Sequence, residues 1–287
     1  MPRSLSRKYL ITVLLGVLTV LTLTYACAGS GNAKDGPWSE PRSDKLIPGI
    51  GKVAWFEGGD DAARTVAFVH GTPGNAAAWK DYLGNVPPEF NFIALDRPGF
   101  GASTTGVVPE LSRQASTLVS LLPDTGGKAI LIGHSLGGPI IARAAIDFPD
   151  RVGALVIVAG SLDPGLEKIN PLQHIGRWWP VSRLLPRSLY NSNLEIFALE
   201  AELELLKQDL DRITIPVIII HGTKDRLVPY ENVVYMKQTM TNAALEVVTL
   251  EGQNHFLPWN SKDVVDEAIR RALQMMDVPT QRASLID

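Results

Sequence analysis

Short and almost uninterrupted apolar runs recur along the chain, and they constrain its fold more than any other feature. Strands with an apolar residue at every position are buried on both faces, which is typical of a parallel sheet covered by helices. Such runs occupy residues 65–69, 92–95, 129–132, 154–158 and 217–220. Residues 245–250 follow as a last strand candidate, and residues 53–56 are expected to add an edge strand.

Helical patterns fill most of the intervals between these runs, at residues 109–122, 135–147, 229–240 and 261–276. This alternation predicts an α/β fold with a doubly wound and mostly parallel sheet. The chain has 287 residues, of which 45% are hydrophobic and 20% are charged, so it can bury a core of this size. We expect residues 46–287 to form this domain.

One stretch interrupts the alternation. Residues from about 161 to 212 contain Trp178, Trp179 and several prolines, and an amphipathic segment follows from Leu194 to Leu210. A long insertion without a strand is uncommon in a compact domain and usually has a function. We interpret this insertion as a helical cap over the carboxyl edge of the sheet. The alternative is an excursion that packs on the domain without contacting any ligand.

The start of the chain has the layout of an export signal. Three basic residues among the first eight precede an uncharged run at residues 9–26, and the only cysteine, Cys27, follows directly. The residues before Cys27 resemble a bacterial lipobox, which implies that residues 1–27 are a signal peptide that ends at a lipidated cysteine. An uncleaved membrane anchor and ordinary secretion are the alternatives. All three place the remainder in the cell envelope outside the cytoplasm, and the Gly- and Pro-containing segment 28–45 is expected to be a flexible tether.

Charge and cysteine content exclude other classes of protein. The net charge of −3 argues against a nucleic-acid-binding face, which needs clustered basic residues. A single cysteine allows neither an internal disulfide nor a thiolate cluster for a metal. The expected partners are therefore a small-molecule substrate and a bacterial membrane, reached through the lipid anchor or an N-terminal helix, with no metal and no nucleic acid.

A candidate nucleophile lies in the sequence Gly133-His134-Ser135-Leu136-Gly137. This G-x-S-x-G pattern follows the apolar run at 129–132 and precedes a helical pattern, as a nucleophile elbow requires. The glycines permit a tight turn from strand to helix that exposes the hydroxyl of Ser135. Backbone N–H groups at the start of that helix point toward developing negative charge.

Serine needs a base to take its proton, and the chain offers five histidines. His255 alone lies late in the chain, on the loop after the last strand candidate. Asp225, on the loop after the run at 217–220, is the candidate acid that would orient the imidazole. The chain order Ser135, Asp225, His255 is the nucleophile–acid–base order of α/β folds that carry such an elbow.

The second donor of an oxyanion hole is expected on an early loop between strand and helix. His70-Gly71-Thr72-Pro73-Gly74 directly follows the run at 65–69. The backbone N–H of Thr72, paired with that of Leu136, is expected to bind the oxyanion. We assign His70 to scaffolding.

These segments, together with Leu95-Asp96-Arg97-Pro98-Gly99-Phe100-Gly101-Ala102-Ser103, resemble the α/β-hydrolase superfamily over roughly residues 50–275. The Asp96–Ser103 loop resembles the capped branch that contains epoxide hydrolases and haloalkane dehalogenases. Those enzymes use an aspartate nucleophile, whereas this chain has Ser135, which argues for acyl-transfer chemistry. The resemblance implies a serine hydrolase without a cofactor: a carboxylesterase, lactonase, C–C bond hydrolase, cofactor-free haloperoxidase or small peptidase.

Two-step hydrolysis of a carboxylic ester is the mechanism that we expect. A different class, a lipid-anchored binding protein that has lost its chemistry, is the alternative. The insertion carries an apolar load outside the sheet, and Trp178 and Trp179 are candidate substrate-binding residues. We therefore expect a small or medium apolar acyl substrate between cap and sheet. The apolar residues are Trp178, Trp179, Leu184, Leu185, Leu189 and Phe197.

Overall fold

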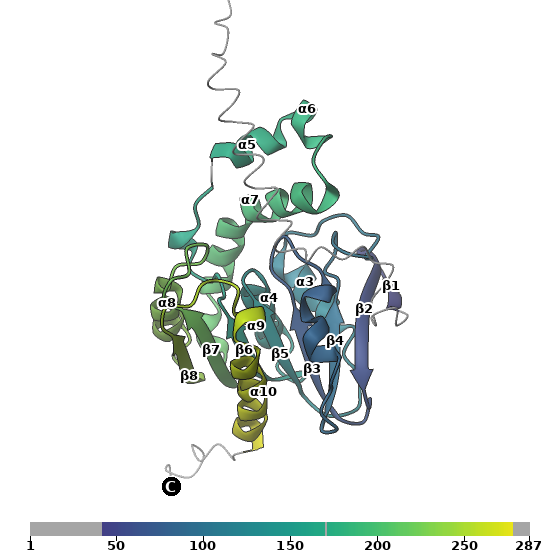
Figure 1. The fold of residues 1–287 in the computed structure, drawn as a ribbon, viewed down its shortest axis with the longest axis vertical. Helices are drawn as coiled ribbons and strands as arrows, with labels where there is room; N and C mark the ends of the chain where they lie inside the picture. The colour runs from purple at the N-terminus through teal and green to yellow at the C-terminus, as the bar shows by residue number, and fades with distance from the viewer. Residues whose placement is uncertain (1–41, 170, 278–287) are drawn as a thin grey trace, which may run out of the picture.

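An eight-stranded sheet forms the centre of the computed structural model, which describes residues 42–169 and 171–277 (Figure 1). The strand order is β1-β2-β4-β3-β5-β6-β7-β8. All seven expected strands are present, and the doubly wound, mostly parallel sheet is confirmed. The strands are β1 (Ser43–Ile47), β2 (Gly51–Gly59), β3 (Arg64–Val69), β4 (Phe90–Leu95), β5 (Ala129–His134), β6 (Val152–Val158), β7 (Pro216–Gly222) and β8 (Ala244–Leu250).

Strands β3 to β8 run parallel, whereas β2 pairs antiparallel with both β4 and β1. The inner strands are buried at nearly every position, as their uninterrupted apolar sequences require. Strand β1 was not expected. It begins at Ser43, so the last residues of the expected tether pair with the edge of the sheet. The sequence did not reveal this strand because Ser43–Ile47 is mostly polar and exposed, and contributes edge hydrogen bonds rather than a buried apolar run.

Helices cover both faces of the sheet (Figure 1). One face packs against α3 (Leu111–Val119), α4 (Gly137–Asp147) and α8 (Glu231–Thr239), and the apolar side chains of these helices join one core cluster. The other face packs against η1 (Ala76–Trp79), α2 (Lys80–Leu83), α9 (Leu257–Asn260) and α10 (Lys262–Asp277). The sheet is therefore stabilised by one buried layer of apolar side chains on each of its faces.

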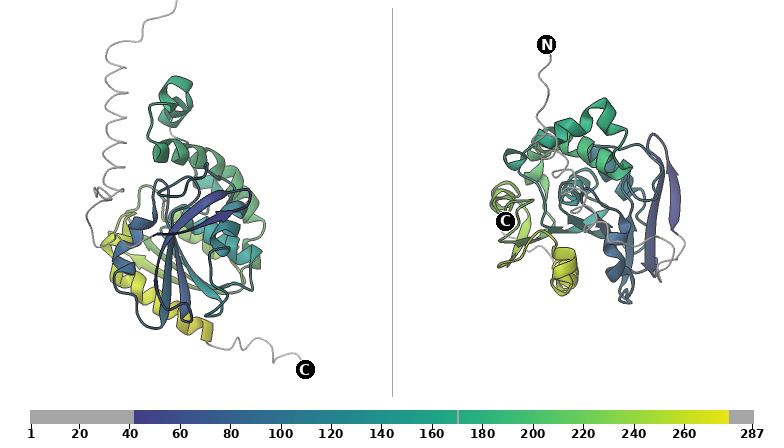
Figure 2. Two further views of the ribbon diagram at one scale, coloured as in Figure 1. Left: turned by 90° about the vertical axis from the view of Figure 1, so that its right-hand side faces the viewer. Right: turned by 45° about the horizontal axis from the view of Figure 1, so that its top comes forward.

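The segment between β6 and β7 contains helices and no strand among its described residues. They are η2 (Pro164–Leu166), α5 (Pro171–Arg177), α6 (Trp179–Ser182), α7 (Arg187–Lys207) and η3 (Leu210–Arg212). Leu199, Leu203 and Leu206 attach α7 to the core. Both figures show α5 and α6 beyond α7, standing out from the body of the molecule (Figures 1 and 2).

The N-terminal features expected from the sequence, the signal segment at residues 1–27 and Cys27 itself, lie outside the described residues. Within the part that is described, no helix combines the length and apolarity needed to cross a bilayer.

Candidate active site

Ser135 occupies the turn between β5 and α4 in a strained backbone conformation. Its φ angle is 55°, in the left-handed region that side chains other than glycine rarely adopt. The backbone packs tightly here, since a Cβ on Gly133 would lie 2.4 Å from the Gly137 carbonyl oxygen, and one on Gly137 would lie 2.3 Å from that of Val69. Only glycine fits on either side, which is how the sequence forces this elbow.

Asp225 and His255 are brought together from two neighbouring strands. They follow β7 and β8, whose carboxyl ends lie side by side because the strands are parallel. The Nδ1 atom of His255 lies 2.7 Å from Oδ2 of Asp225, and both residues are buried. The other carboxylate oxygen, Oδ1, accepts the backbone N–H groups of Leu227 and Val228, each at 2.9 Å.

These hydrogen bonds keep Asp225 ionised. Burial acts to raise the pKa of its carboxyl, but the hydrogen bond and charge of His255 and the two backbone donors outweigh burial, so the pKa is lowered. A charged Asp225 accepts a hydrogen bond from the Nδ1–H group of His255, which leaves Nε2 as the nitrogen with the lone pair. The imidazole is thus held in the tautomer that a general base needs.

His134 joins the elbow to the loop that carries His255. Its Nε2–H donates to the carbonyl oxygen of His255 at 3.0 Å, and the two rings lie 4.7 Å apart. Burial, reinforced by the neighbouring His255, lowers the pKa of His134 to about 3. His134 is therefore neutral, and it connects the residue before Ser135 directly to His255.

His221 supports Asp225 from the end of β7. Its Nε2–H donates to the carbonyl oxygen of Val228 at 2.9 Å, and the amide of Val228 in turn donates to Asp225. Burial lowers the pKa of His221, so this ring is also neutral. It is a positioning residue for the carboxylate.

The loop that carries Thr72, one of the two expected oxyanion donors, approaches Ser135 at Gly71. Gly71 lies so close to the serine that a Cβ there would come within 2.8 Å of the Ser135 Cβ and 3.3 Å of its Oγ. Thr72 follows Gly71, and Leu136 follows Ser135. No hydrogen bond among the described residues uses the backbone N–H of Thr72 or Leu136, so both donors remain available for a ligand oxygen.

A buried ion pair links the loop after β4, which carries Arg97, to the cap helix α7. Arg97 and Glu195 form two hydrogen bonds, Nη1 to Oε1 at 2.5 Å and Nη2 to Oε2 at 3.1 Å, and each side chain is 1% exposed. The same guanidinium donates to the Gly71 carbonyl oxygen at 2.9 Å and to Gln114 at 2.7 Å. His70 accepts the backbone N–H of Arg97 at 3.1 Å, in agreement with the scaffolding role expected for His70.

The ion pair was not expected from the sequence. The available signal was the spacing of α7, where Glu195 stands on the same helical face as the buried Leu199 and Leu203. A carboxylate on the buried face of a helix needs a cation beside it, because an unpaired charge is costly to bury.

Trp178 and Trp179 lie at the outer end of the cap and are each 65% exposed. Their expected contact with substrate stays a prediction.

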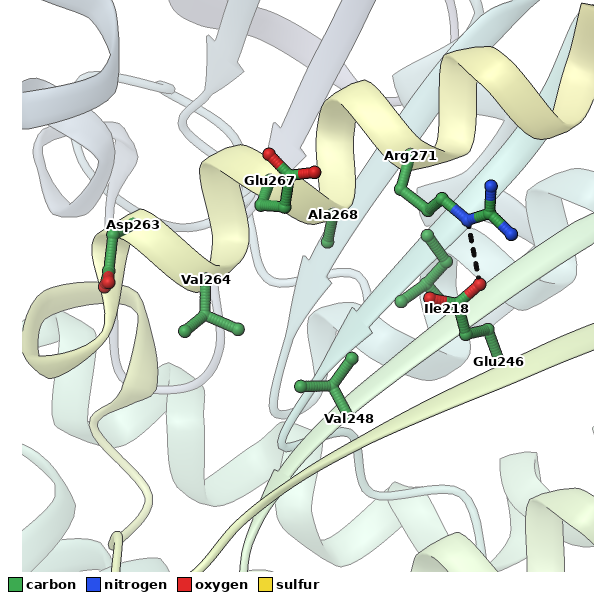
Figure 3. A pocket seen from close by; sticks show the side chains of 8 residues that line it. All are labelled: Ile218, Glu246, Val248, Asp263, Val264, Glu267, Ala268 and Arg271. Carbon is green, nitrogen blue, oxygen red and sulfur yellow. Dashed lines mark hydrogen bonds and ion pairs between the residues drawn. The ribbon is translucent and has the colours of Figure 1, made fainter.

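A cavity of about 330 Å³ lies elsewhere, between α10 and strands β7 and β8 (Figure 3). Glu246 and Arg271, which both line it, pair at 3.0 Å, and Ile218 and Val248 are among its apolar lining residues. None of the candidate catalytic residues lines it. Across the described residues, no group of three or more His, Cys, Asp or Glu side chains is arranged to hold a metal ion.

The elbow, the candidate acid–base pair and the doubly wound sheet are the features of a hydrolase scaffold. The chain belongs to the alpha/beta hydrolase family, whose sequence model matches residues 66–268.

Two curated relatives and one solved structure illustrate the similarity. The human mitochondrial palmitoyl-protein thioesterase ABHD10 is 28% identical over 173 residues, which cover 57% of this chain and 56% of the thioesterase. A pimeloyl-[acyl-carrier protein] methyl ester esterase of Citrobacter koseri is 27% identical over 212 residues, covering 61% of this chain and 81% of the esterase. A hydrolase from Pseudomonas aeruginosa PA01 has a TM-score of 0.64 at 19% identity, covering 82% of this chain and 99% of that one.

The match spans little more than half the length of the human thioesterase. The likeness to the Pseudomonas structure concerns the fold alone. The membership shows that the protein is an α/β hydrolase, and the identity of its substrate is a separate question.

Proposed function

We propose that the protein hydrolyses small or medium apolar carboxylic esters through an acyl-enzyme on Ser135. One observation supports the proposal: a buried Asp225–His255 pair at 2.7 Å is joined through His134 to an elbow whose serine has a φ angle of 55°. Such a pair activates a hydroxyl that is otherwise a weak nucleophile.

In the first step, Nε2 of His255 takes the proton of Ser135 as Oγ attacks the acyl carbon. The carbonyl oxygen becomes an oxyanion, and the amides of Thr72 and Leu136 stabilise it. His255 then returns the proton to the leaving alcohol. In the second step, His255 deprotonates a water molecule that attacks the acyl carbon, and it then returns this proton to Oγ of Ser135 as the bond to the acyl group breaks and the acid leaves. Asp225 stabilises the imidazolium in both steps without taking its proton.

A neutral acyl group suits the charges around the elbow. The guanidinium that contacts the Gly71 loop, Arg97, is neutralised by Glu195, and His134 is uncharged at neutral pH. An anionic substrate would therefore meet no uncompensated cation from either group. The names of the human and Citrobacter relatives, a thioesterase and a methyl ester esterase, also describe acyl substrates.

A fluorophosphonate probe tests the nucleophile. We expect stoichiometric labelling of Ser135 in the wild type and none in Ser135→Ala. Absence of labelling in both would favour a binding protein that has lost its chemistry.

A series of chromogenic esters tests the substrate class. Each added methylene that becomes buried contributes at most about 0.8 kcal/mol, so kcat/KM should rise in steps of up to about fourfold over a few carbons. Matched lactone, peptide and β-diketone substrates should be turned over more slowly. Labelling of Ser135 combined with a stronger preference for one of these would replace the ester with that substrate.

We also propose that Cys27 is lipidated and holds the domain at the outer side of a membrane. The support is the sequence alone: a basic start, an apolar run and a single cysteine directly after it.

A further inference from the structure

The cap ends in an exposed cluster of large apolar side chains, which we call the cap tip. It comprises Ile175, Trp178, Trp179 and Leu184, with exposed fractions of 36%, 65%, 65% and 84%. Isolated apolar residues on a surface are ordinary, but a cluster that includes two adjacent indoles indicates an interaction site. The tip is formed by α5, α6 and the residue pair that follows α6, and it stands beyond α7 (Figures 1 and 2).

The tip is held in place from below, so its exposure is a property of the fold. Asn193 on α7 donates to the Gln173 carbonyl oxygen at 2.9 Å, and a Cβ on Gly176 would lie 3.0 Å from the Asn193 amide nitrogen. The ring of Phe197, also on α7, packs against His174 at 5.0 Å. These contacts join α5 to α7, whereas Trp178 and Trp179 at the start of α6 remain mostly exposed.

The segment that carries the tip has only positive charges between Glu167 and Glu195. From Lys168 to Leu194 the sequence holds four basic residues and no aspartate or glutamate, in a chain whose net charge is −3. Arg183 lies over the ring of Trp179 at 4.8 Å, and Arg177 lies over Phe197 at 4.6 Å. Arg187 is held by the carbonyl oxygens of Ser103 and Thr105. Arg183 thus lies against a tip tryptophan, and Arg177 directly precedes Trp178 in the chain while it packs on Phe197 of α7.

We propose that the cap tip docks on the surface of an anionic lipid bilayer. Indole rings favour the headgroup region, and arginines there are attracted to anionic lipids. A protein partner with an apolar face would match the tryptophans, but it would need its own acidic ring to match the arginines. A bilayer supplies both, and the protruding shape lets the tip reach a flat surface. This proposal does not depend on the chemistry at Ser135.

The test measures how deeply the two indoles enter the bilayer. Because residues 1–27 are expected to bind lipid by themselves, co-sedimentation would not isolate the tip. The full chain is mixed with phosphatidylcholine vesicles, with or without 30% phosphatidylglycerol, whose acyl chains are brominated near the headgroup. Bromine quenches tryptophan fluorescence only at short range, so the readout is the quenched fraction.

We expect strong quenching in the anionic vesicles and loss of that signal in Trp178→Ser/Trp179→Ser. Arg177→Gln/Arg183→Gln should require much more anionic lipid for the same quenching, since each cation near the surface contributes about fivefold in affinity. Trp259→Phe, which removes another partly exposed indole on α9, is the matched control and should retain the quenching. Thermal unfolding of each variant checks that these surface changes leave the fold intact.

Equal quenching of the wild type and the double tryptophan variant would overturn the proposal, as would no quenching of the wild type. If quenching is the same with and without anionic lipid and is unchanged in the double arginine variant, the proposed attraction of the tip to anionic lipid is overturned. Sedimentation velocity without lipid tests whether the tip instead binds a second copy of the chain. A dimer that the tryptophan substitutions abolish, without quenching by vesicles, would assign the tip to a second copy of the chain.

Discussion

Replacing Glu195 with glutamine should lower the free energy of unfolding by about 3–5 kcal/mol, because it leaves the charge of Arg97 buried without its counter-ion. Both side chains are 1% exposed, so solvent cannot take over the lost interaction. The two hydrogen bonds of the pair, at 2.5 and 3.1 Å, form a fork that a neutral amide reproduces only in part. Gln114 and the Gly71 carbonyl oxygen still accept from Arg97, but neither carries a full negative charge.

Urea unfolding at neutral pH provides the measurement, with the midpoint and slope compared between variants. Glu200→Gln is the matched control, because Glu200 is exposed on the same helix, and its replacement should change the stability by no more than about 0.5 kcal/mol. Arg97→Met/Glu195→Leu removes both charges. It should recover much of the stability, since apolar side chains of similar volume often replace a buried ion pair at little cost.

The double variant separates stability from activity. Without Arg97, the Gly71 carbonyl oxygen loses its 2.9 Å hydrogen bond, and the loop that carries the Thr72 amide is less well held. We expect kcat to fall by roughly tenfold or more while KM changes little, because the oxyanion donor acts in the transition state. If the free energy of unfolding falls by less than about 1 kcal/mol in Glu195→Gln, the reasoning that this variant leaves an uncompensated charge buried on Arg97 is refuted.

Three further results are expected. Ser135→Ala and His255→Ala should each abolish ester turnover, and their combination should be little worse than either alone; multiplying losses would show that they act separately. The free energy of unfolding should fall between about pH 6.5 and 5, by up to about 1.4 kcal/mol per pH unit for each histidine that is neutral when folded, because the unfolded chain protonates near 6.5; a flat profile in urea titrations would contradict this. In Cys27→Ser, mass spectrometry should find no lipid at the N-terminus, whereas retention of residues 1–26 in wild-type protein would support an anchor instead. The histidines with lowered pKa values are His70, His134 and His221.

The sign of the pH effect follows from the direction of these shifts. Burial lowers the pKa of each of the three rings, so folding favours the neutral form, and their contribution is complete above about 6.5. Asp225 acts at lower pH. Its pKa is lowered in the folded state, and its contribution is lost only as the pH falls through and below the ordinary value of 3.8.

The apolar runs in the sequence were sufficient to predict seven of the eight strands and their order along the chain, but not the polar edge strand β1. Runs such as 129–132 and 217–220 are apolar at every position, and only burial on both faces accounts for that pattern. The candidate nucleophile was also accessible from the sequence. Gly133 and Gly137 leave Ser135 few alternatives to a sharp turn, and the chain order placed Asp225 and His255 after it. These features are local, or follow from the rule that parallel strands end at one edge.

Tertiary structure alone decided the contacts between distant segments. Glu195 and Arg97 are separated by nearly a hundred positions, and nothing in either neighbourhood specifies the partner. The bond from His134 to His255 likewise depends on how two loops meet. The exposure of Trp178 and Trp179 was the clearest such case, because the sequence records that a segment is apolar but not which side a neighbouring helix covers. Burial is a property of two surfaces in contact, and the second surface, here α7, comes into place only when the chain is folded.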